Sequence, residues 1–170
     1  MFGEIGIIIG QVLSIAAVVL GFISFQMKSP KGLLAFQIAT ALTFSVHYLL
    51  IGAMTACALN FIASIKLVCY YIRNKRQSTN IIIPAFFSLL ILVTSALTWD
   101  GWYSSFIMVG LFINAVGFAI PNVQTIRKLN LIKSPLCLIY NIFVLSTGGI
   151  IFEAASIVST VIGLIRDRKR

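Results

Sequence analysis

The chain has 170 residues, of which 59% are hydrophobic and only 10% are charged. A soluble domain of this length needs far more polar surface, so the composition excludes that class and indicates a protein that crosses a membrane several times. The formal net charge of +9 does not indicate nucleic acid, because the basic residues form short blocks between apolar runs, without an aromatic and basic face or a known binding motif.

Apolar runs separated by short polar connections predict seven membrane-spanning helices. The first run follows Glu4, with no basic leader and no cleavage site before a soluble domain, so we expect a retained helix rather than a signal peptide. Glycines at 52 and at 148–149 are expected to turn the chain, and QTIRKLNLIK at 124–133 is expected to be a basic connection. The predicted spans are residues 5–25, 33–51, 54–72, 81–99, 103–122, 132–147 and 150–165.

The basic residues predict an orientation for these spans. If the N-terminus lies outside, all but one of the 13 Lys and Arg residues fall on the cytoplasmic side, and the exception is Lys66 within the third span. Glu4 and Asp100 then lie outside, and the C-terminus is cytoplasmic. The four cytoplasmic blocks are residues 28–31, 73–76, 127–133 and 166–170.

The uncharged run at 81–99 lies between two similar halves. LGFISFQ at 20–26 is echoed by VGFAIPN at 116–122, an offset of 96 residues that also pairs Gly52 with Gly148. A three-helix unit crosses the membrane an odd number of times, so a second copy fused directly behind it would be inverted. One extra helix between the copies gives both the same direction in the membrane. The sequence therefore predicts an all-α membrane protein of two parallel three-helix bundles and a linker helix (3+1+3), over residues 1–76, 102–170 and 77–101 respectively.

Polar residues inside the spans are the candidates for a central cavity. An amide within a span needs hydrogen-bond partners, so Asn60 and Asn114 either bond across helix interfaces or face a wet cavity. The further candidates for lining such a cavity are Gln11, Gln37, His47, Asn141 and Ser156.

Three titratable residues within the spans have two interpretations each. His47 either bonds to a neighbouring helix or takes part in solute binding or proton coupling. Lys66 either extends its side chain to the cytoplasmic headgroups or faces the cavity and attracts an anionic group. Glu153 either suits a helix N-terminus, at the expected start of the seventh helix, or acts as a proton site.

No set of catalytic residues is visible. The chain has one histidine and no acidic pair, glycine-rich phosphate loop or nucleophile elbow, so we expect no enzymatic activity. The three cysteines lie in apolar runs without metal-ligand spacing and are interpreted as small core residues. We expect neither a metal nor a cofactor.

The layout, with Phe25-Gln26 in one half and Pro121-Asn122 in the other, resembles the superfamily of PQ-loop proteins, SWEET and semi-SWEET facilitators and KDEL receptors. Within it, the stretches FQMKSPKG and IPNVQTIRKLNLIKSP look most like bacterial inner membrane proteins of the YgjV type. The resemblance implies two triple-helix bundles with hinges near Gln26, Pro121 and Asn122. It matches Asn60 to a substrate-contacting asparagine but gives the nearby tryptophans no counterpart, so a sugar substrate is not supported.

These observations predict a multi-pass protein of a bacterial inner membrane that carries a small polar solute by alternating access. The alternative is a membrane receptor or accessory protein that binds a ligand or partner helix without transport. The expected partners are the lipid bilayer, an unidentified solute and further copies of the chain, with no nucleic acid.

Overall fold

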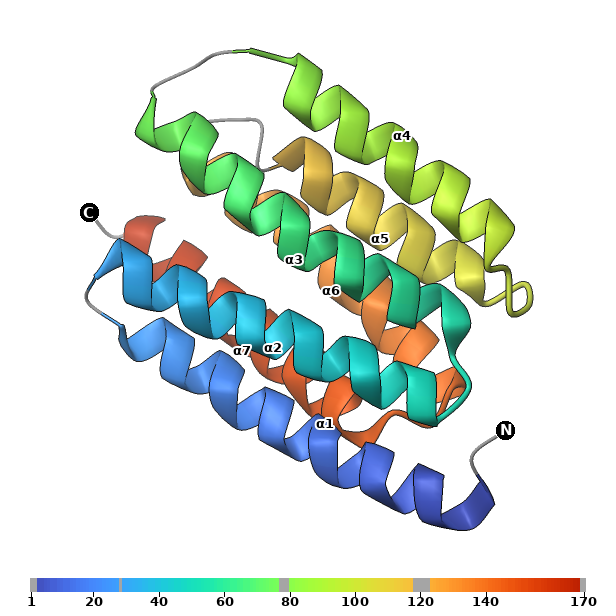
Figure 1. The fold of residues 1–170 in the computed structure, drawn as a ribbon. Helices are drawn as coiled ribbons and strands as arrows, with labels where there is room; N and C mark the ends of the chain where they lie inside the picture. Colours follow the sequence, from blue (N-terminus) through green and yellow to red (C-terminus); the bar gives the residue numbers. More distant parts are fainter. Residues whose placement is uncertain (1–2, 28, 77–79, 118–122, 169–170) are drawn as a thin grey trace.

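The computed structural model describes residues 3–27, 29–76, 80–117 and 123–168. These residues form seven helices and no strands (Figure 1). The helices are α1 (Gly3–Gln26), α2 (Pro30–Leu50), α3 (Met54–Lys75), α4 (Ile82–Leu97), α5 (Ser104–Gly117), α6 (Val123–Phe143) and α7 (Thr147–Arg168). By length and composition α1, α2, α3 and α7 are long and apolar enough to cross a membrane, and α4 and α5 are shorter apolar helices.

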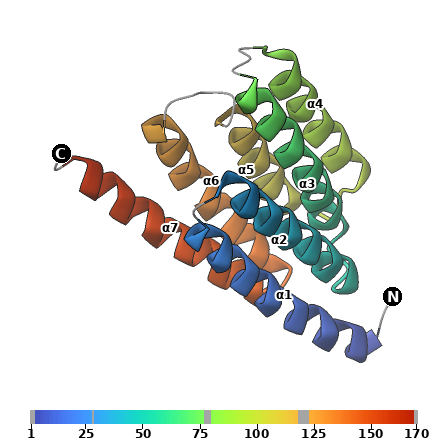
Figure 2. The ribbon, with the colours of Figure 1, turned by 60° about the vertical axis from the view of Figure 1, so that its left-hand side comes forward.

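Six helices, all except α4, form a ring, and α4 packs against the outside of that ring. Neighbours in sequence pack together from α1 to α3 and from α5 to α7, while α3 touches α5 and α7 returns to α1. α4 packs against α3 and α5 (Figures 1 and 2). The first and last helices of the chain therefore close the ring.

Successive helices run in alternate directions, so the polar connections gather at two ends of the bundle (Figure 1). One end, which we call the basic end, carries Lys31, Arg73 and Lys75 where α2 begins and α3 ends. The other end, which we call the acidic end, carries Glu4 in the first turn of α1 and Asp100 between α4 and α5. This separation of charge is the one that the sequence predicts.

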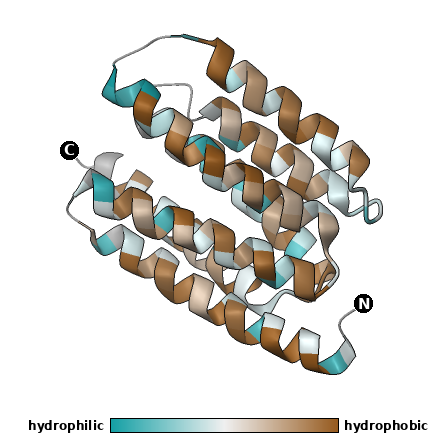
Figure 3. Ribbon diagram, viewed as in Figure 1, coloured by the Kyte–Doolittle hydropathy of each residue, from teal (hydrophilic) through white to brown (hydrophobic). Residues whose placement is uncertain are grey.

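The polarity of the molecule is inverted relative to a soluble protein. Large apolar side chains such as Ile5, Ile8 and Leu97 are exposed, and Figure 3 shows apolar residues over the lengths of the helices. Polar groups such as Ser14 and His47 are instead fully buried. The interior combines these polar groups with buried apolar residues such as Leu59 and Phe87, and the apolar exterior suits hydrocarbon as the surrounding solvent.

The predicted basic connection at 124–133 is wrong, because these residues belong to α6. The stretch from Val123 to Ser134 contains no glycine or proline, and its Leu, Gln, Arg and Lys residues favour a helix. Even Pro135 lies inside α6. Lys133, expected at the membrane surface, is consequently carried into the bundle, where it is buried.

The predicted glycine turn at 148–149 is also wrong, since Gly148 and Gly149 lie in the first turn of α7. The chain turns instead at Leu145, whose φ is 54°. The amide of Ser146 donates to the carbonyl of Asn141, as the amide of Ala53 donates to that of Tyr48 in the turn at Gly52.

The α2–α3 and α6–α7 hairpins thus have matching dimensions. α2 and α6 have 21 residues each, and α3 and α7 have 22 each. The matching helices begin 93 positions apart, at 30 and 123 and at 54 and 147. Leu145, rather than Gly148, is therefore the counterpart of Gly52.

Replacing Leu145 with glycine is expected to raise the free energy of unfolding by about 1 kcal/mol. A left-handed conformation costs an L-residue roughly 1–2 kcal/mol, and Leu145 is exposed, so few packing contacts are lost. Thermal unfolding in detergent measures the change. Gly52→Ala, at the matching position with φ 82°, should lower the free energy of unfolding. Equal effects of the two changes would contradict the left-handed conformation of Leu145.

Candidate functional site

A cavity of about 210 Å³ lies at the centre of the ring. Side chains from α1, α2, α3, α5, α6 and α7 line it, and none of its described lining residues comes from α4. Six of the polar or charged residues singled out in the sequence meet here: Gln37, Asn60, Lys66, Asn114, Asn141 and Glu153.

An ion pair crosses from α6 to α7 in the wall of this cavity. Lys133 Nζ lies 2.6 Å from Glu153 Oε1, and the two side chains are only 11% and 9% exposed. The second carboxylate oxygen, Glu153 Oε2, is buried and has no hydrogen-bond partner among the described residues. A buried carboxylate oxygen without a donor is costly, so Glu153 is suited to receive a donor from a molecule in the cavity.

The interpretation of Glu153 as a helix N-terminal residue is wrong, because α7 begins at Thr147 and Glu153 lies well inside it. Its partner Lys133 was not predicted, because the basic residues before it are typical of a cytoplasmic connection. The absence of glycine and proline between Val123 and Ser134 is the signal that indicates a helix there.

A second lysine faces the same cavity from α3. Lys66 is 4% exposed, and its Nζ donates to Asn114 Oδ1 of α5 at 2.6 Å. The Lys66 ammonium thus remains within the bundle rather than reaching the headgroups, so of its two interpretations the geometry agrees with the one that faces the cavity.

The other amides have different partners. Asn60 donates to the carbonyl of Ala56 in its own helix, and Asn141 Oδ1 accepts from the Tyr48 hydroxyl at 2.6 Å. Ser156 is not among the cavity-lining residues; it accepts from Asn130 and Ser134 between α6 and α7.

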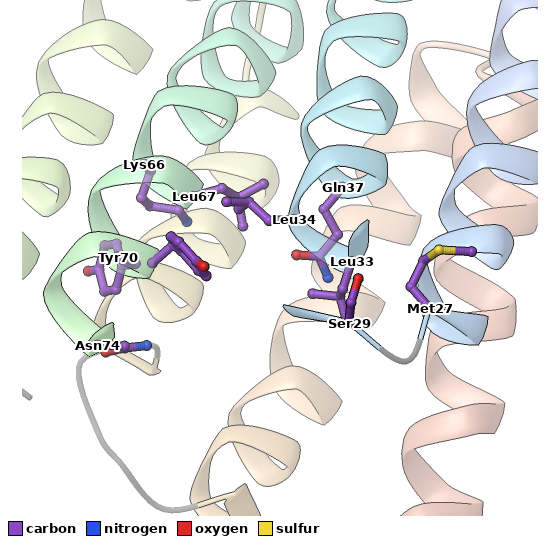
Figure 4. A pocket seen from close by; sticks show the side chains of 10 residues that line it. Met27, Ser29, Leu33, Leu34, Gln37, Lys66, Leu67, Tyr70 and Asn74 are labelled. Atoms are coloured by element: carbon purple, nitrogen blue, oxygen red, sulfur yellow. The ribbon is translucent and has the colours of Figure 1, made fainter. Parts of the chain in front are cut away.

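A pocket of about 320 Å³ separates α2 from α3 at the basic end. Figure 4 shows Lys66 and Tyr70 on α3 across the pocket from Gln37 and Leu33 on α2. Gln37, Lys66 and Leu67 line both this pocket and the central cavity. The basic-end pocket therefore adjoins the central cavity.

At the acidic end, hydrogen bonds from His47 join two helices, α1 and α2, to the α6–α7 turn. Its Nδ1 lies 2.8 Å from the carbonyl oxygen of Gly10 and its Nε2 2.7 Å from Ser146 Oγ. Because a carbonyl oxygen only accepts, Nδ1 donates to it, and the neutral ring accepts the Ser146 hydroxyl proton at Nε2. His47 is therefore bonded to neighbouring elements and does not line the cavity.

Further hydrogen bonds close the same end. Gln11 Nε2 donates to the carbonyl of Leu145 at 2.6 Å, and the amide of Gly148 donates to Ser14 Oγ at 3.1 Å. At the same end of the bundle, where α3 begins, the amide of Thr55 donates to Asp100 Oδ2 at 2.8 Å. Gln11, predicted to line the cavity, instead belongs to this closed end.

Replacing Ser146 with alanine is expected to lower the free energy of unfolding by about 1–3 kcal/mol. The change leaves buried His47 Nε2 without its donor and the amide of Gly149 without its acceptor. Thermal unfolding in detergent measures the loss. Ser105→Ala removes an exposed hydroxyl that bonds to the carbonyl of Trp102, and its effect should stay within about 0.5 kcal/mol. Equal losses in the two variants would contradict a structural role for the His47 bonds.

The three hinge candidates lie away from the cavity or outside the described residues. Gln26 is exposed at the end of α1. Pro121 and Asn122 lie outside the described residues.

The arrangement was compared with known proteins. No curated protein and no solved structure matches the chain. A family model with the description "Imp-YgjV: Bacterial inner membrane protein" matches residues 8–170. This match covers nearly the whole chain and agrees with the apolar exterior and the four long apolar helices. The chain belongs to the Imp-YgjV family of bacterial inner membrane proteins and is a multi-pass protein of that membrane.

Proposed function

We propose that this protein is a carrier that moves a small polar solute across the inner membrane by alternating access, without covalent chemistry. The observation that carries the proposal is a cavity inside the ring, lined by apolar side chains and several polar ones, that adjoins a pocket at the basic end and faces a set of hydrogen bonds between helices at the acidic end. A carrier needs a central site that opens to one side at a time.

The two hairpins supply the moving parts of this proposal. The matching lengths and turns of α2–α3 and α6–α7 support an internal repeat, and with it the 3+1+3 organisation of the PQ-loop and SWEET superfamily. In this scheme α4 links the two bundles, and rocking of one bundle against the other breaks the bonds that join α1 and α2 to the α6–α7 turn at the acidic end.

The orientation in the membrane follows from charge. Short loops rich in Lys and Arg stay in the cytoplasm, so we place the basic end inside and the N-terminus outside. In this orientation the basic-end pocket faces the cytoplasm. Single cysteines at Lys31 and at Asp100, in a variant without the three native cysteines, test it. An impermeant thiol reagent should label position 100 from outside and position 31 only after lysis; the reverse pattern would contradict the orientation.

Binding is tested first, by thermal shift of the purified protein with sugars, nucleosides, amino acids and organic acids. A ligand at 100 times its dissociation constant stabilises the folded state by about 2.7 kcal/mol. A ligand bound in the cavity should lose its effect in Asn60→Ala and keep it in Ser105→Ala, whose hydroxyl lies at the acidic end.

Transport is tested by counterflow of the same ligand in proteoliposomes, with and without an imposed pH gradient. Flux that depends on the protein supports a carrier, and its response to the gradient separates a facilitator from a proton-coupled carrier. Saturable binding without flux would replace the carrier with the receptor or accessory protein.

A further inference from the structure

The Lys133–Glu153 ion pair leaves hydrogen-bonding capacity on both of its partners. An ammonium group has three N–H donors, and among the described residues Lys133 Nζ donates to Glu153 Oε1 alone, at 2.6 Å. The other carboxylate oxygen, Glu153 Oε2, is buried and accepts from no described residue. Both residues line the central cavity, so a molecule bound there meets unused donors beside an unused acceptor.

The unused acceptor favours a solute with an ammonium group. A buried carboxylate oxygen without a donor is costly, so Glu153 Oε2 takes its donor from the contents of the cavity. Solvent and hydroxyl groups supply a neutral donor. An ammonium group adds the attraction of its charge for the carboxylate, which is strong where little water screens it.

The same solute needs a negative group beside its ammonium group. Glu153 already has Lys133 as a neighbour, so a second positive group at Oε2 is repelled by the Lys133 ammonium. A carboxylate on the carbon that carries the solute's ammonium group offsets this repulsion, because it can accept from an unused N–H of Lys133 Nζ. Four charges of alternating sign then lie side by side, which offsets the cost of taking each of them out of water.

The apolar part of the wall and the volume limit the rest of the solute. Phe44 and Phe152 line the cavity with their ring centroids 5.6 Å apart, and Ile107 and Leu111 add aliphatic surface. These four side chains offer no partner to a further charged group, so an uncharged side chain suits them. A volume of about 210 Å³ is below the usual range for drug-sized ligands, which favours a solute of a few carbons.

We propose, on the basis of the carrier function above, that the cavity binds a small α-amino acid with an uncharged side chain, as its zwitterion. The ammonium group of the amino acid donates to Glu153 Oε2, and its carboxylate accepts from Lys133 Nζ. A solute that lacks the carboxylate, the positive group or an N–H on that group bonds to only one of the two residues.

Probes that differ by one group test the class in the unmodified protein. Thermal shifts are measured at neutral pH and constant ionic strength with millimolar alanine, lactate, ethylamine, glycine and glycine betaine. Lactate lacks the ammonium group, ethylamine lacks the carboxylate, and glycine betaine keeps both charges but has no N–H. Glycine and alanine should raise the unfolding temperature, and the other three should act more weakly. Shifts with lactate or glycine betaine that equal those of the amino acids, or no shift with either amino acid, would overturn the proposal.

Removing the ion pair as a unit tests the site. The double variant Lys133→Gln, Glu153→Gln keeps the size of both side chains and leaves no buried charge without its partner, so we expect it to fold. Its dissociation constant for alanine should rise by about tenfold or more, because hydrogen bonds to charged groups are lost at both ends of the amino acid. Ser105→Ala, whose hydroxyl lies outside the cavity, should keep the wild-type value.

A second double variant guards against a loss of fold. Lys133→Met, Glu153→Leu fills the same space with apolar groups and should lose alanine binding to at least the same extent. Wild-type affinity for alanine in either double variant, with the unfolding transition retained, would contradict the role of the ion pair.

Counterflow distinguishes a wrong substrate class from a wrong function. Amino acid binding without flux would leave the class in place and remove the carrier. Protein-dependent flux of sugars or organic acids, together with no response to amino acids, would keep the carrier and remove the class.

Discussion

Replacing Glu153 with alanine is expected to lower the free energy of unfolding by about 3–5 kcal/mol, the largest effect of a charge change in this protein. The change leaves the Lys133 ammonium, 8% exposed and 2.6 Å from its partner, without a counter-ion. It also removes the one carboxylate among the described residues that line the cavity. Chemical unfolding in mixed micelles, followed by tryptophan fluorescence, measures the loss.

The double variant Lys133→Met, Glu153→Leu is the matched control. It removes both charges and fills their space with apolar groups, a change that is often neutral or stabilising for a buried pair. Its stability should therefore lie close to that of the wild type and well above that of Glu153→Ala. A double variant as unstable as the single one would show that the pair is not the source of the loss.

Replacing Gly148 with leucine is expected to lower the free energy of unfolding by about 3 kcal/mol, at the upper end for an overpacked site. A Cβ at this position would lie 2.5 Å from both Cβ and the carbonyl oxygen of Ser14. Since the carbonyl is backbone, α1 as a whole has to move away from α7. The hydrogen bond from the amide of Gly148 to Ser14 Oγ is lost with it.

Ala154→Leu, an exposed position on the same helix, controls for the addition of a leucine to α7. Thermal unfolding in detergent and retention on a sizing column should be close to those of the wild type for Ala154→Leu and altered for Gly148→Leu. A Gly148→Leu variant that unfolds like the wild type would contradict the close approach of α1 and α7.

The number of helices could be predicted from the sequence because apolar runs and breakers are local signals. α2 and α3 begin and end within a few residues of the predicted spans, at Pro30 and at the turn around Gly52. The errors arise where the local signal is misleading. Basic residues suggested a loop at 124–133, yet Lys133 is stabilised by Glu153, 20 residues further along the chain. Leu145, not a glycine, adopts the positive φ.

The candidate site was partly visible for the same reason. An amide or an ammonium group within an apolar run stands out, so Asn60, Asn114 and Lys66 could be predicted from the sequence, whereas the cavity that they share could not. The position of His47 could not be predicted, because its partner Ser146 is 99 residues away and serine is an unremarkable residue in a span. Contacts across the ring depend on which helices become neighbours, and the spacing of residues in the sequence does not predict these neighbours.

The closure of the ring by α1 and α7 has a consequence for biosynthesis. At a typical ribosomal rate, roughly ten seconds pass between the synthesis of α1 and that of α7. During this interval α1 has only one of its two ring neighbours, and Lys133, once synthesised, lacks the carboxylate of Glu153 until 20 further residues have followed. α7 therefore completes both the ring and the charge pairing. A nascent chain that ends before α7 presents an ammonium group to the lipid, and such a chain should be a substrate for membrane quality control.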